Sequence, residues 1–126
     1  MKAIQYLIDK TGALIQPTTI SFSNIDLESN HPTGNQITCI FYDAISTSST
    51  GVITPINPVT TGMTGTINIQ ARSNDDSAWS NIQNGLLDLS TGENMVFPSG
   101  VIRSINAICT SITGCNYILI RLDRGV

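Results

Sequence analysis

The sequence is poor in charged residues, and this shortage excludes one class of partner. Charged residues make up 12% of the 126-residue chain, about half of the roughly 25% usual in soluble domains. The six Lys and Arg residues are scattered along a chain of net charge −3. Nucleic-acid binding through phosphate contacts requires clustered positive charge. We therefore expect no nucleic-acid partner.

Long apolar runs are also missing, because the longest unbroken run is only a few residues. Such runs are too short to span a bilayer. The first ten residues, MKAIQYLIDK, lack the apolar core and the small-residue cleavage site of a signal peptide. We expect no membrane partner, and we expect the chain to be made in the cytoplasm of its host cell.

Histidine and cysteine are too few, and wrongly spaced, for a zinc site. The chain has one histidine and three cysteines without a CxxC spacing, so we expect no metal and no cofactor. Cys109 and Cys115 bracket TSITG, which we interpret as a hairpin loop, and two thiols could face each other there within about 7 Å. We favour the alternative that these cysteines and Cys39 are small buried side chains in a reducing compartment.

What the sequence does contain is alternation of apolar and polar residues. In TINIQARS the residues Ile67, Ile69 and Ala71 alternate with polar neighbours, and we expect Ile67 and Ile69 to face the core. Abundant Ser, Thr, Asn and Gln favour strands and turns over helices. About eight to ten such short strands, separated by turn signals, predict one all-β domain over residues 1–126. A β-sandwich of jelly-roll type fits this number of strands.

The two halves of the chain differ in regularity. Residues 65–126 form the most regular β region, whereas residues 1–64 combine strands with possible extended arms, including an extended N-terminal region. The segment Ser46–Gly65 is rich in Ser, Thr, Gly and Pro. Within it, Pro55 and Pro58 limit any strand to a sheet edge or an arm, because proline donates no backbone hydrogen bond.

The last predicted strand, around YILIRLD, is apolar on more than one face. Ile118, Ile120 and Leu122 share one face, while Leu119 lies between Tyr117 and arginine on the other. A strand with one face in solvent usually alternates strictly between apolar and polar residues, which this strand does not. We therefore expect the second face to be covered by a neighbour.

The stretch RSNDDSAW contains the most prominent candidate ligand groups, Asp75, Asp76 and Trp79. Calcium needs six or more oxygen ligands at defined offsets, which this stretch lacks, so we interpret it as a hairpin turn. Trp79 could stack on a sugar, but carbohydrate sites usually present several aromatic residues, and here these are scattered. We interpret Trp79 as an anchor at one end of the core, with its indole N–H bonded locally.

Signals for catalysis are weak. His31 lies in a proline–glycine loop without a nearby activated nucleophile. The acids Asp43, Asp88, Glu93 and Asp123 could in principle pair for glycoside hydrolysis, but nothing in the sequence marks a cleft. We predict a protein that is not an enzyme.

Four arginines of the second half are candidates for an interface. Arg72, Arg103, Arg121 and Arg124 lie in or just beyond predicted strands. Arginine is enriched at interfaces because its planar head pairs bidentately while its stem packs. Isolated, solvated arginines are an equally open interpretation.

The segment from Gly65 to Gly125 resembles a pattern found in small bacteriophage virion proteins. Its elements are TINIQARSNDDSAW, FPSGVIRSINAI and ITGCNYILIRLDRG, and they cover about half of the chain. The resemblance implies a β-sandwich that assembles on a capsid, neck or tail, often as a trimer in decoration proteins. It implies no catalytic residues.

We therefore predict a virion protein that decorates the capsid as a cement protein and bridges neighbouring capsomers. Its expected partners are the major capsid protein or other virion proteins, together with copies of itself, a trimer being favoured. The alternative is a carbohydrate-binding or host-recognition module of a phage tail or neck. In that alternative, Trp79 and the loop with Asp75 and Asp76 lie at the binding end.

Overall fold

The structure is a computed structural model that describes residues 2–15, 25–29, 36–72, 78–98 and 102–124, with side chains described at 7–15, 36–72, 78–98 and 105–122. The described residues form nine strands and one 3-10 turn. These are β1 (Lys2–Asp9), β2 (Ile25–Ser29), β3 (Gln36–Thr47), β4 (Ile53–Val59), β5 (Thr64–Arg72), β6 (Ser80–Asp88), η1 (Leu89–Thr91), β7 (Met95–Val96), β8 (Ile102–Thr113) and β9 (Tyr117–Arg124). The prediction of an all-β chain is confirmed.

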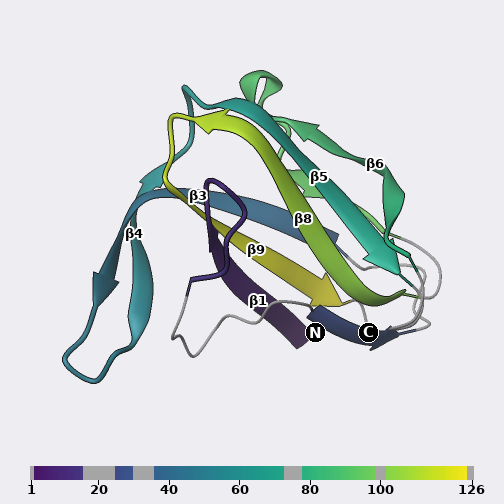
Figure 1. The fold of residues 1–126 in the computed structure, drawn as a ribbon, viewed down its shortest axis with the longest axis horizontal. Helices are drawn as coiled ribbons and strands as arrows, with labels where there is room; N and C mark the ends of the chain where they lie inside the picture. Colours follow the sequence, from purple (N-terminus) through teal and green to yellow (C-terminus); the bar gives the residue numbers. More distant parts are fainter. Residues whose placement is uncertain (1, 16–24, 30–35, 73–77, 99–101, 125–126) are drawn as a thin grey trace.

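The strands form two antiparallel sheets that pack as a sandwich (Figure 1). Sheet A has the order β1-β9-β3-β4, with β7 also paired to β3, and sheet B has the order β2-β8-β5-β6. Each sheet combines strands from both halves of the sequence. The more regular second half of the sequence therefore does not correspond to a separate part of the fold.

The main core lies between the two sheets and is built by the alternating residues. Ile67 and Ile69 of β5 are fully buried, as are Ile118, Ile120 and Leu122 of β9. The predicted inward orientation of Ile67 and Ile69 is confirmed. Each such side chain stabilises the fold by about 1.5–3 kcal/mol relative to exposure.

A second, smaller apolar cluster covers the opposite face of sheet A. Leu7 and Leu119 are directly paired across β1 and β9, and Leu119 is in turn paired with Ile40 of β3. Leu7 and Leu119 are buried, together with Ile53 of β4. Sheet A therefore has apolar residues on both of its faces.

The outer face of sheet B is polar and almost uncharged. Asn68 and Gln70 of β5 both donate side-chain hydrogen bonds to Asn81 Oδ1 of β6, at 2.9 and 3.1 Å. Two apolar side chains interrupt this polar face. They are Leu86 and Ile108, which are 60% and 44% exposed and flank Asn68 on either side in register.

One glycine is required where β5 and β8 change register. Gly65 has φ +100°, and a Cβ placed on it would lie 2.5 Å from the carbonyl oxygen of Ser111. Ser111 itself has φ +52°, at the bulge that shifts the pairing. Only a residue without a side chain fits this close approach.

β4 and the second half of β3 form a hairpin over residues 41–59, here called the arm, which extends beyond the other strands of both sheets (Figure 1). β4 is an edge strand and contains both Pro55 and Pro58. This confirms the prediction that these prolines restrict the segment to an edge or an arm. The expected N-terminal arm is wrong for β1, because β1 is paired along its whole length with β9; residues 16–24 lie outside the described residues.

Candidate functional site

The predicted ligand stretch is only partly described, and its tryptophan makes an unexpected contact. Asp75 and Asp76 lie outside the described residues. Trp79 is half-buried, and the Arg72 guanidinium carbon lies 4.3 Å from the centre of its ring. Such stacking is a cation–π contact. Trp79 is not among the described residues of the two core clusters, and its interpretation as an anchor at one end of the core stays a prediction.

The four candidate interface arginines are divided between the two sheets. Arg72 and Arg103 belong to sheet B, whereas Arg121 and Arg124 belong to sheet A. Arg121 is exposed and is paired in register with Thr38. The side chains of Arg103 and Arg124 are outside the described part. A single arginine-based interface is therefore not supported by their placement.

Two of the candidate carboxylates, Asp88 and Asp43, accept hydrogen bonds that hold the surrounding structure. Asp88 Oδ1 caps the η1 turn by accepting from Ser90 N and Ser90 Oγ. Asp43 Oδ1 accepts from Asn116 Nδ2 at 3.0 Å. The Asp123 side chain and His31 lie outside what the structure describes. Among the described residues, no group of three or more His, Cys, Asp or Glu side chains is placed to hold a metal ion.

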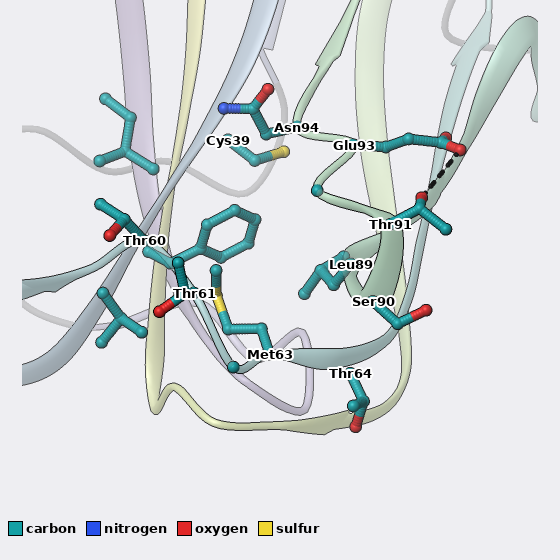
Figure 2. A pocket seen from close by; sticks show the side chains of 15 residues that line it. Cys39, Thr60, Thr61, Met63, Thr64, Leu89, Ser90, Thr91, Glu93 and Asn94 are labelled. Atoms are coloured by element: carbon teal, nitrogen blue, oxygen red, sulfur yellow. Dashed lines mark hydrogen bonds between the residues drawn. The ribbon is translucent and has the colours of Figure 1, made fainter.

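A cavity of about 670 Å³ opens at the edge of sheet A, between the β4–β5 connection and η1 (Figure 2). Four buried side chains line it: Cys39, Phe41, Met63 and Leu89. Hydroxyl groups surround them. These belong to Thr60, Thr61, Thr64, Ser90 and Thr91. The volume lies within the range of small-molecule sites, roughly 300–1,000 Å³.

Among the described residues that line the cavity, Glu93 is the one carboxylate, and its own turn engages it. Glu93 Oε1 accepts from Thr91 Oγ1 at 3.2 Å, the contact drawn in Figure 2, and Glu93 Oε2 accepts from the Asp88 backbone N–H at 3.4 Å. The Cys39 thiol is neutral at ordinary pH, because burial, with Cys109 nearby, raises its pKa to about 12. The cavity therefore suits an apolar group more than ionic chemistry.

The three cysteines are free thiols, and the hairpin interpretation around two of them is wrong. β8 and β9 lie in different sheets, so the connection with Cys115 crosses between the sheets. Cys39 and Cys115 are buried and Cys109 is half-buried. Burial, with Asp9 and Cys115 nearby, raises the pKa of Cys109 to about 11. The expectation of small, buried side chains is confirmed for Cys39 and Cys115.

Exposed apolar side chains mark two further surfaces. On the arm, Val52 and Ile56 are 37% and 38% exposed. Next to β7, Phe97 is 67% exposed and Met95 39%. Exposed apolar side chains of this kind are candidates for contact with a partner. The sequence signalled the arm through its prolines, whereas nothing in the sequence pattern distinguished Phe97 from a buried strand residue.

Comparison of the chain with protein-family models, curated proteins and solved structures gave no match. Among the described residues, no helix has the length and apolar character needed to span a membrane.

Proposed function

We propose that this chain is a non-enzymatic structural protein of a bacteriophage virion, which decorates the capsid and bridges neighbouring capsomers. The observation that carries the proposal is the arm, which extends beyond the other strands of both sheets and bears exposed apolar side chains (Figure 1). A protein that bridges two neighbours needs a contact surface away from its own body, and the arm supplies one.

The arm suits a binding role because it is stiff and partly apolar. Its strands are paired from Phe41 opposite Val59 to Thr47 opposite Ile53. The backbone of the arm is therefore already ordered before a partner binds. Preordered contacts lose less entropy when a complex forms. Val52 and Ile56 then offer apolar surface to a capsid partner.

The pairing of the strands supports the jelly-roll prediction. Without β4, eight strands remain, and four of their pairings are nested: β1 with β9, β2 with β8, β3 with β7, and β5 with β6. Nested pairs of this kind arise when one long antiparallel ribbon is rolled up, as in a jelly roll. Jelly rolls are common in viral capsid and lectin domains. In this interpretation the arm is an addition to the eight-stranded roll.

The polar outer face of sheet B supports assembly with copies of this chain or with other virion proteins. Its Asn, Gln and Thr side chains carry no charge, and charged residues are depleted at the centres of interfaces. A trimer is the assembly that we propose. Weak contacts repeated over many copies of the shell suffice to strengthen it. The proposed location is the virion, after synthesis in the host cytoplasm.

The alternative function, a carbohydrate-binding or host-recognition module of a tail or neck, loses support at Trp79. The Arg72 guanidinium covers one face of the indole ring. A sugar that stacked on that face would have to displace the arginine. Trp79 is therefore a weaker sugar platform than an uncovered tryptophan.

The test of the decoration proposal is binding to expanded capsids that lack the protein. We expect the wild-type chain to bind and to raise the temperature at which the capsids disrupt. Ile56→Asp and Val52→Asp on the arm should each weaken binding by about tenfold, since central apolar contacts dominate interfaces. Asn94→Asp, which adds the same charge at an exposed position outside both the arm and sheet B, is the matched control. Failure of the wild type to bind, or capsids equally heat-resistant without it, would refute the proposal.

A further inference from the structure

A second cavity lies at the end of sheet A where β1 ends, β9 begins and β3 passes between body and arm. Its volume is about 450 Å³, within the range of small-molecule sites. Its lining combines polar and apolar residues. They are Asp9, Lys10, Thr11, Ile15, Asp43, Ala44, Ile45, Asn116 and Tyr117. We call it the Tyr117 pocket.

The fold brings two tyrosines together at this pocket, although they are far apart in the sequence. Tyr117 of β9 is directly paired with Tyr42 of β3 on one side and with Asp9 of β1 on the other. Both tyrosines are half-buried and pack on the second apolar cluster. Tyr117 lines the pocket itself, and Tyr42 lies beside it. The scattered aromatic residues of the sequence thus form a pair in the structure.

A fixed amide–carboxylate pair lies next to the tyrosines. Asn116 Nδ2 donates to Asp43 Oδ1 at 3.0 Å and to the Asp43 backbone oxygen at 2.9 Å. The Asn116 backbone is held as well, because its N–H donates to Tyr42 O and its carbonyl accepts from Lys10 N, both at 3.0 Å. Both side chains are exposed. Within the described part of the chain, no hydrogen bond occupies Asn116 Oδ1 or the Lys10 ammonium.

The third side of the pocket is a turn that is also ordered. Asp9 Oδ1 accepts hydrogen bonds from Thr11 N at 2.8 Å, from Thr11 Oγ1 and from Ala13 N at 3.1 Å. The turn therefore presents Lys10 and Thr11 at the rim without needing a ligand to order them. Preorganised sites lose less free energy on binding.

We propose that the Tyr117 pocket binds a neutral saccharide. A sugar ring has one apolar face of C–H groups and a rim of hydroxyls. The Tyr117 ring matches the face, while Asp43, Asn116 and Lys10 supply acceptors and donors for the hydroxyls. With two carboxylates and one ammonium in its lining, the pocket has no surplus of positive charge for an anionic ligand. This proposal goes beyond capsid decoration and does not rest on it.

The test is a titration of the full-length protein with small saccharides, in which backbone amide NMR signals monitor binding. The probes are the methyl glycosides of glucose, galactose, mannose and N-acetylglucosamine, with methyl glucuronide as the anionic comparison. We expect at least one neutral glycoside to shift the amides of Lys10, Asn116 and Tyr117 saturably at millimolar concentration, an affinity usual for a single small ligand. The glucuronide should bind more weakly.

Variants separate stacking from hydrogen bonding and from damage to the fold. Tyr117→Phe keeps the ring and should retain binding, whereas Tyr117→Ala should weaken it by about tenfold. Asn116→Ala, at an exposed position, should weaken binding similarly even if Tyr117→Ala fails to fold. Trp79→Ala is the control at the other aromatic site and should change nothing.

Three results would overturn the proposal. They are the absence of a saturable shift with every neutral glycoside, shifts confined to the neighbourhood of Trp79, and equal binding by the Asn116→Ala variant. Capsid binding is measured separately on Tyr117→Ala. Loss of saccharide binding with retained capsid binding is the pattern expected when the two functions are independent.

Discussion

The two sheets of this protein differ in what their outer faces do. Sheet A has buried apolar residues on both faces, with Ile118 and Ile120 toward sheet B and Leu7 and Leu119 on the other side. Among the described side chains, sheet B buries the apolar residues of its inner face, where Ile67 lies, and its outer face carries Asn, Gln and Thr. The outer faces of the two sheets therefore differ in how far they are exposed to solvent.

This difference explains why the strands have different sequence patterns. β5 of sheet B alternates cleanly, because every second residue is solvated. β9 of sheet A has three apolar residues in a row, Ile118 to Ile120, because both of its faces are covered there. The expected neighbour over the second face of β9 includes residues of the same chain: Leu119 packs with Leu7 of the adjacent strand β1 and with Ile53.

The largest expected effect tests the inner against the outer face of sheet B. Ile67→Ala removes a fully buried side chain and should lower the free energy of unfolding by about 2–5 kcal/mol. Ile108→Ala, at a 44% exposed position one strand away, should change it by about 0.5 kcal/mol or less. Urea denaturation measures both. Equal losses would show that the outer face of sheet B is also packed.

The next effect tests the outer face of sheet A. Leu119→Ala should lower the free energy of unfolding by about 2–3 kcal/mol, because Leu119 is buried against Leu7 and Ile53. The same denaturation experiment compares it directly with Ile108→Ala. If Leu119→Ala were as mild as Ile108→Ala, the second apolar cluster would not contribute to stability and the contrast between the sheets would disappear.

A smaller effect is expected at the end of the polar face of sheet B. Arg72→Ala removes the guanidinium from the Trp79 ring and should cost about 0.5–1 kcal/mol. It should also shift the emission of this single tryptophan to longer wavelength, since the indole becomes more exposed to water. Arg121→Ala removes an equal charge from sheet A. An emission shift in that control would mean that the response is not local.

The smallest expected effect is a loss of stability at acid pH, which depends on Asp9 at the end of sheet A. Burial would raise the pKa of Asp9, but hydrogen bonds from Thr11, Ala13 and Gly12 hold it below its ordinary value of 3.8. In acid the unfolded chain therefore binds a proton before the folded chain does. The stabilisation is complete above the ordinary pKa and is lost as pH falls through the lowered one.

Asp9→Asn checks this pH dependence, because it keeps an acceptor oxygen but removes the titration. Between about pH 6 and about pH 3 the wild type should lose more stability than the variant, as judged from urea midpoints. Parallel curves for the two proteins would show that Asp9 does not contribute. Cys115→Ser, in the neighbouring loop, would leave the acid limb unchanged.

Much of the fold could be predicted, because its signals are local. Alternation placed Ile67 and Ile69 in the core, and Pro55 and Pro58 placed their segment at an edge. The connection around Cys115 was misread as a hairpin. A hairpin and a crossing between sheets both need only a short loop with glycine, so local turn chemistry does not distinguish them.

The candidate sites were much less predictable. Tyr42 and Tyr117 carry no special local pattern, and only the pairing of β3 with β9 makes them neighbours. Asn116 reaches Asp43 for the same reason. Trp79 stood out in the sequence because it is unique, but its contact with Arg72 follows from the pairing of β5 with β6.

The amino-acid sequence by itself determined that this chain is all-β and poor in charge, with an edge segment limited by proline. These properties depend on composition and on contacts between residues close in the chain. The tertiary structure decided which strands share a sheet, and therefore that sheet A is apolar on both faces and sheet B on only one. It also decided which side chains meet at the Tyr117 pocket. Both outcomes depend on pairing between distant segments, which no local pattern specifies.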